Sequence, residues 1–136
     1  MISTKGQSVV EFAIVLPLFL LFMFGIIYFG MAFADYMSLN DVARSCAREA
    51  SQTSGSNYTE VYKKYSNNDL VAGLYKWDGK TSSDDFKIET KDKGKRVLVH
   101  IHATLDGKDS LVQTFKNLLG NQSLFDINID YSMYKE

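Results

Sequence analysis

The sequence of 136 residues is poor in cysteine, proline and histidine, and its charges nearly cancel. One cysteine, Cys46, excludes an internal disulfide framework and a cysteine-rich zinc site. Lys and Arg number 15 against 16 Asp and Glu, so no excess of positive charge is available for nucleic acid. One proline and nine glycines are too few for a disordered chain. We therefore expect a folded protein with no nucleic-acid partner.

Apolar residues are concentrated in one uncharged run from Phe12 to Ala34. As an α-helix this run is about 35 Å long, enough to cross a hydrocarbon layer of roughly 30 Å. A buried core helix is the alternative, but a remaining domain of about 100 residues is too small to surround a helix that is apolar on every face. Pro17 lies inside the run, and membrane helices tolerate proline. We predict one membrane-spanning helix in contact with lipid.

Three membrane interpretations of this run remain open. The first is a cleaved signal peptide with Lys5 as its basic region and cleavage after Ala34, although the run is longer than such a core, roughly 7 to 15 residues. The second is a plain single-pass anchor. The third depends on Glu11, because a carboxylate at the edge of the bilayer is costly unless a positive group lies nearby. Cleavage between Gly6 and Gln7 would create such a group, an α-ammonium.

Residues 6–17 resemble the N-terminus of TadE-like pseudopilins, the minor subunits of the Tad (Flp) branch of type IV pili. Gly6 is followed, after four residues, by Glu11 and Phe12, and the apolar helix then contains the pair Leu16 and Pro17. The later segment NDVARSCAREA, residues 40–50, is similar to the Ala-Arg-rich amphipathic helix of the same family. The resemblance covers about residues 5 to 50.

The resemblance implies processing and assembly. A prepilin peptidase would remove the leader, residues 1–6, and the new ammonium at Gln7 would pair with Glu11 of the same or a neighbouring subunit, which fixes register. Glu11, Phe12 and Pro17 are the assembly residues that it implies. The other implied partners are pilin or pseudopilin subunits and an inner-membrane assembly platform. Because Tad major pilins have little or no outer domain, the extra domain here implies a minor subunit.

The charges flanking the helix do not decide its orientation, because Lys5 precedes it and Arg44 and Arg48 follow it. The resemblance implies a cytoplasmic N-terminus, an extracytoplasmic domain, and location in a pilus after assembly. The expected division is a leader (1–6), a transmembrane and assembly helix (7–34) and an outer domain (35–136). Residues 35–52 continue the helix into that domain.

Small apolar residues follow the membrane run at helical spacing, and no helix breaker lies between the two. The stripe consists of Leu39, Val42, Ala43, Cys46, Ala47 and Ala50. We predict one helix from about Val9 to Gln52, with the Cys46 thiol buried. Gly30 and Ala34 form a pair of small residues one turn apart, which suits helix packing in the membrane and equally an ordinary membrane-helix glycine.

The rest of the chain predicts an α+β, pilin-like fold, in which a small three-stranded sheet and short helices pack on the long N-terminal helix. One or two short helices are expected over residues 57–75. Alternating apolar residues predict strands over 86–90, 97–105 and 125–133. A further helix is predicted from the apolar stripe Leu111, Val112, Phe115, Leu118 and Leu119, closed by Gly120 and Asn121.

Few residues suggest chemistry. His100 and His102 share one face of a predicted strand, which raises the alternative of a membrane-tethered metalloprotein, but no carboxylate or cysteine cluster accompanies them in the sequence. The turn between the first two predicted strands is basic and contains Lys91, Lys93, Lys95 and Arg96. Solvated charge and protection of a sheet edge explain this turn. No nucleophile or metal motif appears, so we expect no enzyme activity, catalytic residue, metal or cofactor.

Overall fold

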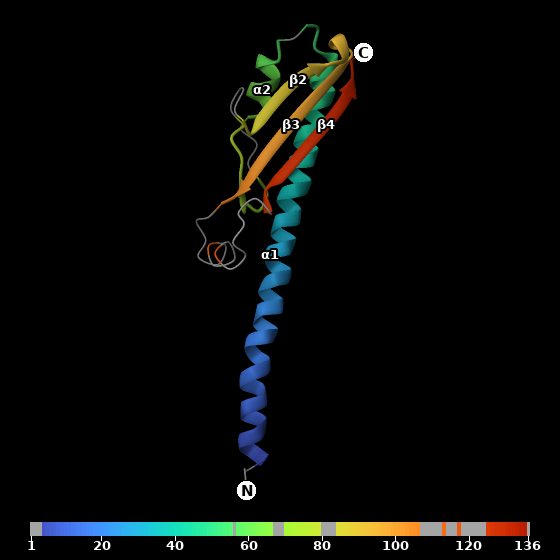
Figure 1. Cartoon of the computed structure of the whole chain (residues 1–136). Helices are drawn as coiled ribbons and strands as arrows, with labels where there is room; N and C mark the ends of the chain where they lie inside the picture. Colours follow the sequence, from blue (N-terminus) through green and yellow to red (C-terminus); the bar gives the residue numbers. More distant parts are fainter. Residues whose placement is uncertain are drawn as a thin grey trace.

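A computed structural model of the chain describes residues 4–55, 57–66, 70–79, 84–106, 113, 117 and 125–135; the side chains of residues 4 and 5 are excepted. Figure 1 shows the elements in order. These are α1 (Thr4–Gln52), α2 (Thr59–Tyr65), β1 (Tyr75–Lys76), β2 (Phe86–Lys91), the 3-10 turn η1 (Asp92–Gly94), β3 (Arg96–Leu105) and β4 (Ile127–Tyr134). The predicted α+β, pilin-like fold is confirmed.

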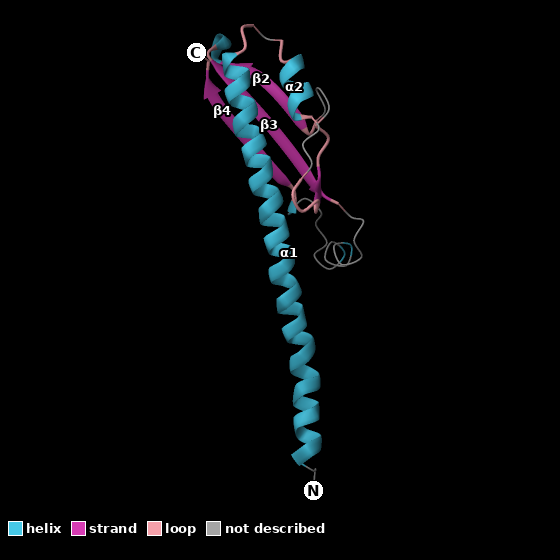
Figure 2. Ribbon diagram, turned by 180° about the vertical axis from the view of Figure 1, so that it is seen from behind, coloured by secondary structure: helices cyan, strands magenta, loops and turns pink. Residues whose placement is uncertain are grey.

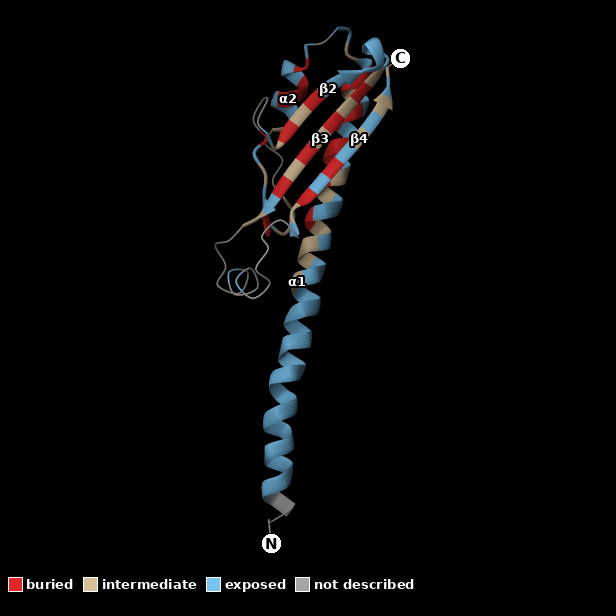
Figure 3. Ribbon diagram, viewed as in Figure 1, coloured by how far each residue is buried: buried red, intermediate tan, exposed pale blue. Residues whose placement is uncertain are grey.

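The helix α1 is a single element of 49 residues that continues through Pro17. At the usual rise per residue it is about 74 Å long. Its continuity from the apolar run into the domain was predicted, although it begins at Thr4 and therefore before Val9. Figure 3 shows that the first half of α1 is exposed and that burial begins only where the sheet covers the second half. The helix therefore has a bare half and a packed half.

The packed half of α1 places its small apolar stripe against one face of the sheet, and α2 covers the same face beside it (Figure 2). All six residues of the predicted stripe are buried. They meet side chains from the inner face of the strands and from α2: Val61, Tyr62, Phe86, Ile88, Val97, Val99, Ile101, Ala103, Ile127 and Ile129. Small residues on α1 allow this close approach of helix and sheet.

The sheet is antiparallel and has β3 at its centre. On one side β3 pairs with β4, with Ile101 opposite Ile129. On the other side it pairs with β2, and then, further along, with the short β1. The three predicted strands are confirmed, and β1 adds a fourth. Odd-numbered residues of β3 face the core, so the even-numbered ones, including His100 and His102, lie on the outer face.

The prediction of helix for residues 70–75 was wrong. Residues 70–74 are irregular, and Tyr75 opens β1. Gly73 has a φ of +67°, a conformation that ends any helical continuation. The backbone N–H groups of this segment are instead used by a side chain of α1, as described below. Of the one or two short helices expected over residues 57–75, the structure has one, α2.

The helix predicted from the apolar stripe Leu111 to Leu119, with its Gly120–Asn121 end, lies outside the described residues except for the isolated positions Gln113 and Asn117.

The Cys46 thiol is fully buried, as predicted, and burial followed by the nearby Glu49 raises its pKa to about 12. The thiolate is the reactive form, so the native thiol should react with iodoacetamide at least about tenfold more slowly than an exposed one at pH 8. The control is Ser45→Cys in a Cys46→Ala chain, since Ser45 is exposed. Mass spectrometry of both proteins over time gives the rates, and equal rates would contradict the burial of Cys46.

Candidate assembly helix and its junction with the domain

Every residue of α1 from Gly6 to Ile27 is exposed. The predicted processing residues Gly6 and Gln7 and the predicted assembly residues Glu11, Phe12 and Pro17 all lie in this bare segment, on its first turns. A Cβ on Gly6 would meet nothing within 4 Å, so the fold itself does not require glycine at that position. The bare segment therefore presents apolar side chains on all of its faces.

Gln7 and Glu11 are four residues apart in the helix, so their side chains share one face. Within the described part of the chain, Glu11 forms no ion pair. The Glu11 carboxylate therefore lies near the start of an exposed apolar helix, where a positive group from outside the described residues can pair with it.

The domain covers the end of the apolar run. Tyr28, Met31 and Ala32 are partly buried and pack against the core. Gly30 is exposed, and a Cβ there would meet nothing within 4 Å, whereas Ala34 is half-buried. The two members of the predicted packing pair therefore differ: Gly30 is open to another helix, and Ala34 is partly covered by its own domain.

Asp35 is the residue that sequence reasoning missed. It is the first fully buried residue along α1, and its carboxylate accepts hydrogen bonds from four consecutive backbone N–H groups of the irregular segment. Oδ1 accepts from Ala72 and Gly73 at 2.8 and 3.2 Å. Oδ2 accepts from Leu74 and Tyr75 at 2.7 and 3.2 Å. The carboxylate thereby replaces the hydrogen bonds that a regular element would have supplied to this segment.

The only sequence signal for Asp35 is its position as the first charged residue after Glu11. In the sequence it reads as the boundary of the apolar run. Its partners are distant in the chain and bind through backbone groups, which carry no residue-specific pattern. Its burial follows from the packing of α1 and could not be read from composition.

At the far end of α1, Glu49 joins the helix to α2. Its Oε2 accepts hydrogen bonds from Lys64 Nζ at 2.7 Å and from the Tyr65 hydroxyl at 3.0 Å. The bond from Lys64 lowers the pKa of Glu49, while burial and then Glu49 raise the pKa of Tyr65 to about 12. Because Glu49 is substantially exposed, solvent screens this contact. It fixes the position of α2 more than it adds stability.

The exposed edge of β2 is covered by two tyrosines. The Tyr62 hydroxyl accepts the backbone N–H of Ile88 at 2.6 Å, and the Tyr58 and Thr90 hydroxyls are 3.0 Å apart. Burial raises the pKa of Tyr62, and the bond from Ile88 opposes that shift. An edge strand covered in this way has fewer free backbone groups with which to pair another strand.

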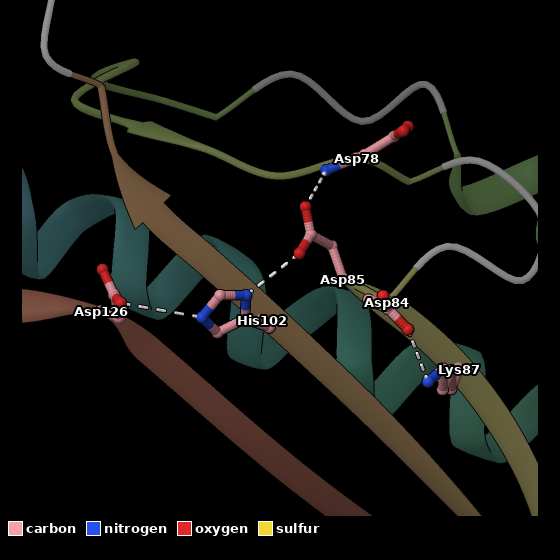
Figure 4. A network of polar contacts seen from close by, with 6 residues as sticks. All are labelled: Asp78, Asp84, Asp85, Lys87, His102 and Asp126. Carbon is pink, nitrogen blue, oxygen red and sulfur yellow. Dashed lines mark hydrogen bonds and ion pairs between the residues drawn. The ribbon is translucent and has the colours of Figure 1, made fainter. Parts of the chain in front are cut away.

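The two histidines bind separate partners on the outer face of the sheet. His100 Nδ1 contacts Asp130, directly opposite on β4. His102 Nδ1 lies 3.0 Å from Asp85 Oδ1, and its Nε2 lies 3.8 Å from Asp126 Oδ2 (Figure 4). The carboxylates flank opposite edges of the His102 ring, so they do not converge on one point. Among the described residues no three ligand side chains gather around a possible metal position.

Comparison with known families gives a match to the N-terminal part of the chain. Residues 6–48, about a third of the chain, match the family described as TadE-like protein. Comparison with curated proteins and with solved structures gives no match. The matched stretch holds the bare helix, Asp35 and most of the buried stripe, while α2 and the sheet lie beyond it.

Proposed function

Because residues 6–48 of this chain are TadE-like, which associates it with the Tad pilus system, we propose that it is a minor pilin or pseudopilin of a Tad (Flp) type IV pilus or secretion apparatus. In this function a prepilin peptidase cleaves between Gly6 and Gln7, and the helix then packs with those of other subunits. The observation that carries the proposal is the bare half of α1, an apolar helix joined without a break to a folded domain.

The bare segment has a length suited to a membrane. From Gly6 to Ile27 it measures about 33 Å, close to the hydrocarbon thickness of roughly 30 Å. It lies within Gly6–Gln52, the one helix among the described residues that is long and apolar enough to cross a membrane. On this proposal the N-terminus is cytoplasmic, the domain is extracytoplasmic, and the membrane surface lies near Tyr28. Gly30 would then contact a neighbouring helix at that surface, together with the uncovered part of Ala34 one turn further on.

The position of Glu11 supports an assembly role. Cleavage after Gly6 would place an ammonium on Gln7, one turn from Glu11 and on the same face. In a medium of low dielectric a stranded carboxylate is costly, so a neighbouring helix that brings an ammonium to Glu11 is held at a defined depth. The partners of the proposed function are the peptidase, other subunits, the assembly platform and membrane lipid, and no step in it requires catalysis or a cofactor.

The burial of Asp35 weighs against the alternative of a secreted binding domain cut after Ala34. Such a cut would place a new ammonium on the backbone of a fully buried residue and would end α1 beside the segment that Asp35 holds. That ammonium would lie beside the Asp35 carboxylate and would compete for it with the N–H groups of residues 72–75. A helix that continues through this position leaves the carboxylate to those groups.

The N-terminal sequence and intact mass of the protein from native membranes test the proposal. We expect a start at Gln7. Gly6→Val should reduce the processed fraction at least about tenfold, because a side chain would obstruct an extended peptide in the protease, while the same change at the exposed Gly25 should leave processing intact. A start at Asp35 would contradict the proposed function.

A further inference from the structure

The outer domain has ends of opposite charge. We define the tip as the end containing η1, where basic residues predominate: Lys91, Lys93, Lys95, Arg96 and Lys135, with Glu89 and Asp92. We define the base as the opposite end, from which bare α1 leaves, where acidic residues predominate: Asp78, Asp84, Asp85, Asp106 and Asp126, with Lys76 and Lys87. The ten residues of β3 separate tip from base by about 33 Å.

The charges of the tip are exposed and held in place. Lys91, Lys93 and Lys95 are exposed and form no ion pair with any residue in the described ranges. Arg96 stacks 4.8 Å from the centre of the Tyr134 ring and lies 3.4 Å from Asp92. These contacts hold the turn and engage Arg96, so the lysines carry the free positive charge of the tip.

The backbone of the tip is also constrained. Asp92 and Lys93 have φ values of 55° and 56°, and Gly94 has 92°. Two successive non-glycine residues in the left-handed region cost of order 1 kcal/mol or more each, and such conformations cluster at functional sites. This turn directs its lysines outward at a fixed end of the domain.

At the base Asp78 and Asp84 are exposed, whereas Asp85, Asp106 and Asp126 are half-buried. The Asp84 side chain is 99% exposed, and its ion-pair partner within the described ranges is Lys87 Nζ at 2.9 Å, which lowers the pKa of Asp84. Asp85 and Asp126 flank His102 beside it, as Figure 4 shows. Since Lys87 and Lys76 only partly offset the aspartates, the described residues of the base carry a surplus of negative charge.

We propose that the tip of one copy of this chain docks on the base of a second copy, head to tail. The positive charge of the tip is complementary to the negative charge of the base. Because one chain carries both surfaces, a second copy of the same chain supplies the partner surface. Such a contact is heterologous, so it repeats in one direction and forms a polar stack. The inference rests on the proposed function, because copies in one flat bilayer lie at equal depth and cannot meet tip to base.

The length of the bare helix permits this stack. A copy displaced by one domain length carries its bare helix, about 33 Å, alongside the domain below it, whose β3 spans a similar distance. The side of α1 turned away from the sheet exposes Phe33, Tyr36 and Met37 to such a neighbour. The consequence is that copies of this subunit occur in runs within a filament.

Cysteine cross-linking in assembled filaments tests the contact. Lys93→Cys and Asp84→Cys are placed together in a Cys46→Ala chain, expressed in cells that carry the Tad apparatus. After oxidation we expect a ladder of disulfide-linked multimers in the sheared filament fraction and none in the membrane fraction. The matched control pairs Asp84→Cys with Lys63→Cys, an exposed lysine of α2 outside the η1 turn, and should give no ladder.

Charge reversal gives a second measurement. One variant replaces Lys91, Lys93 and Lys95 with Glu, and the other replaces Asp78 and Asp84 with Lys. Each alone should lower the number of copies that lie tip to base in filaments at least about tenfold, and co-expression of the two variants should restore that number. Filaments that contain the chain without the ladder, or an equal ladder in membranes, would overturn the head-to-tail contact and leave the proposed function intact. Absence of the chain from filaments would overturn both.

Discussion

Replacing Asp35 with alanine should lower the free energy of unfolding of the domain by about 3 kcal/mol or more. The substitution removes a carboxylate that accepts hydrogen bonds from the backbone N–H groups of residues 72–75, of which those of Leu74 and Tyr75 are buried away from water. A buried donor left without a partner costs about 1 to 3 kcal/mol, although several adjacent losses do not add fully. The expected effect is therefore large for a small domain.

The measurement is urea unfolding of the full chain in detergent, followed by the fluorescence of Trp77. This residue is partly buried, and its ring packs edge-on against Phe86 with centroids 5.4 Å apart, so unfolding changes its surroundings. Asp35→Asn should also destabilise the domain, because the amide nitrogen would present hydrogens to N–H donors. Asp41→Ala is the control, since Asp41 is exposed on the same helix. Equal stability of the Asp35 and Asp41 variants would refute the role assigned to the carboxylate.

Replacing Glu11 with alanine should leave membrane insertion and folding unchanged and reduce incorporation into filaments at least about tenfold. Insertion depends on the apolar length of the bare helix, which the substitution preserves. Assembly in the proposed function depends on pairing between the carboxylate and a neighbouring ammonium, and a factor of ten corresponds to only about 1.4 kcal/mol of that contact. The readout is the ratio of the chain in sheared filaments to the chain in membranes.

Two further variants make the Glu11 experiment specific. Glu11→Gln keeps the shape and removes the charge, so it should behave like the alanine variant if charge is what matters. Glu60→Ala removes an exposed carboxylate of α2, whose lysine partner lies 3.2 Å away, and should incorporate normally. Normal incorporation of Glu11→Ala would remove the assembly role given to this residue.

Those parts of the fold whose contacts follow a local period were predictable from the sequence. The stripe from Leu39 to Ala50 identified the packed face of α1, and alternation identified β2, β3 and β4. The apolar run identified the bare helix. In each case apolar residues recur at the spacing that places them on one face of the element, about every 3.6 residues in a helix and every second residue in a strand.

The parts that were not predictable depend on contacts between distant residues. Residues 70–75 have apolar spacing that suits a helix, yet Asp35, far away in the chain, binds their backbone in another conformation. The pairing of His102 with Asp85 depends on the register of β2 against β3, which the turn at 92–94 sets. The sequence shows these residue types but not which of them become neighbours, because tertiary packing overrides local preference.

The unbroken helix also has a mechanical consequence. Because α1 contains no loop between its bare half and its packed half, a force that draws the helix out of the bilayer passes directly into the contacts with β3 and β4. A rotation of the helix likewise turns the sheet by the same angle. The direction in which the domain faces is therefore set by how the apolar segment is rotated about its own axis when it packs among neighbouring helices.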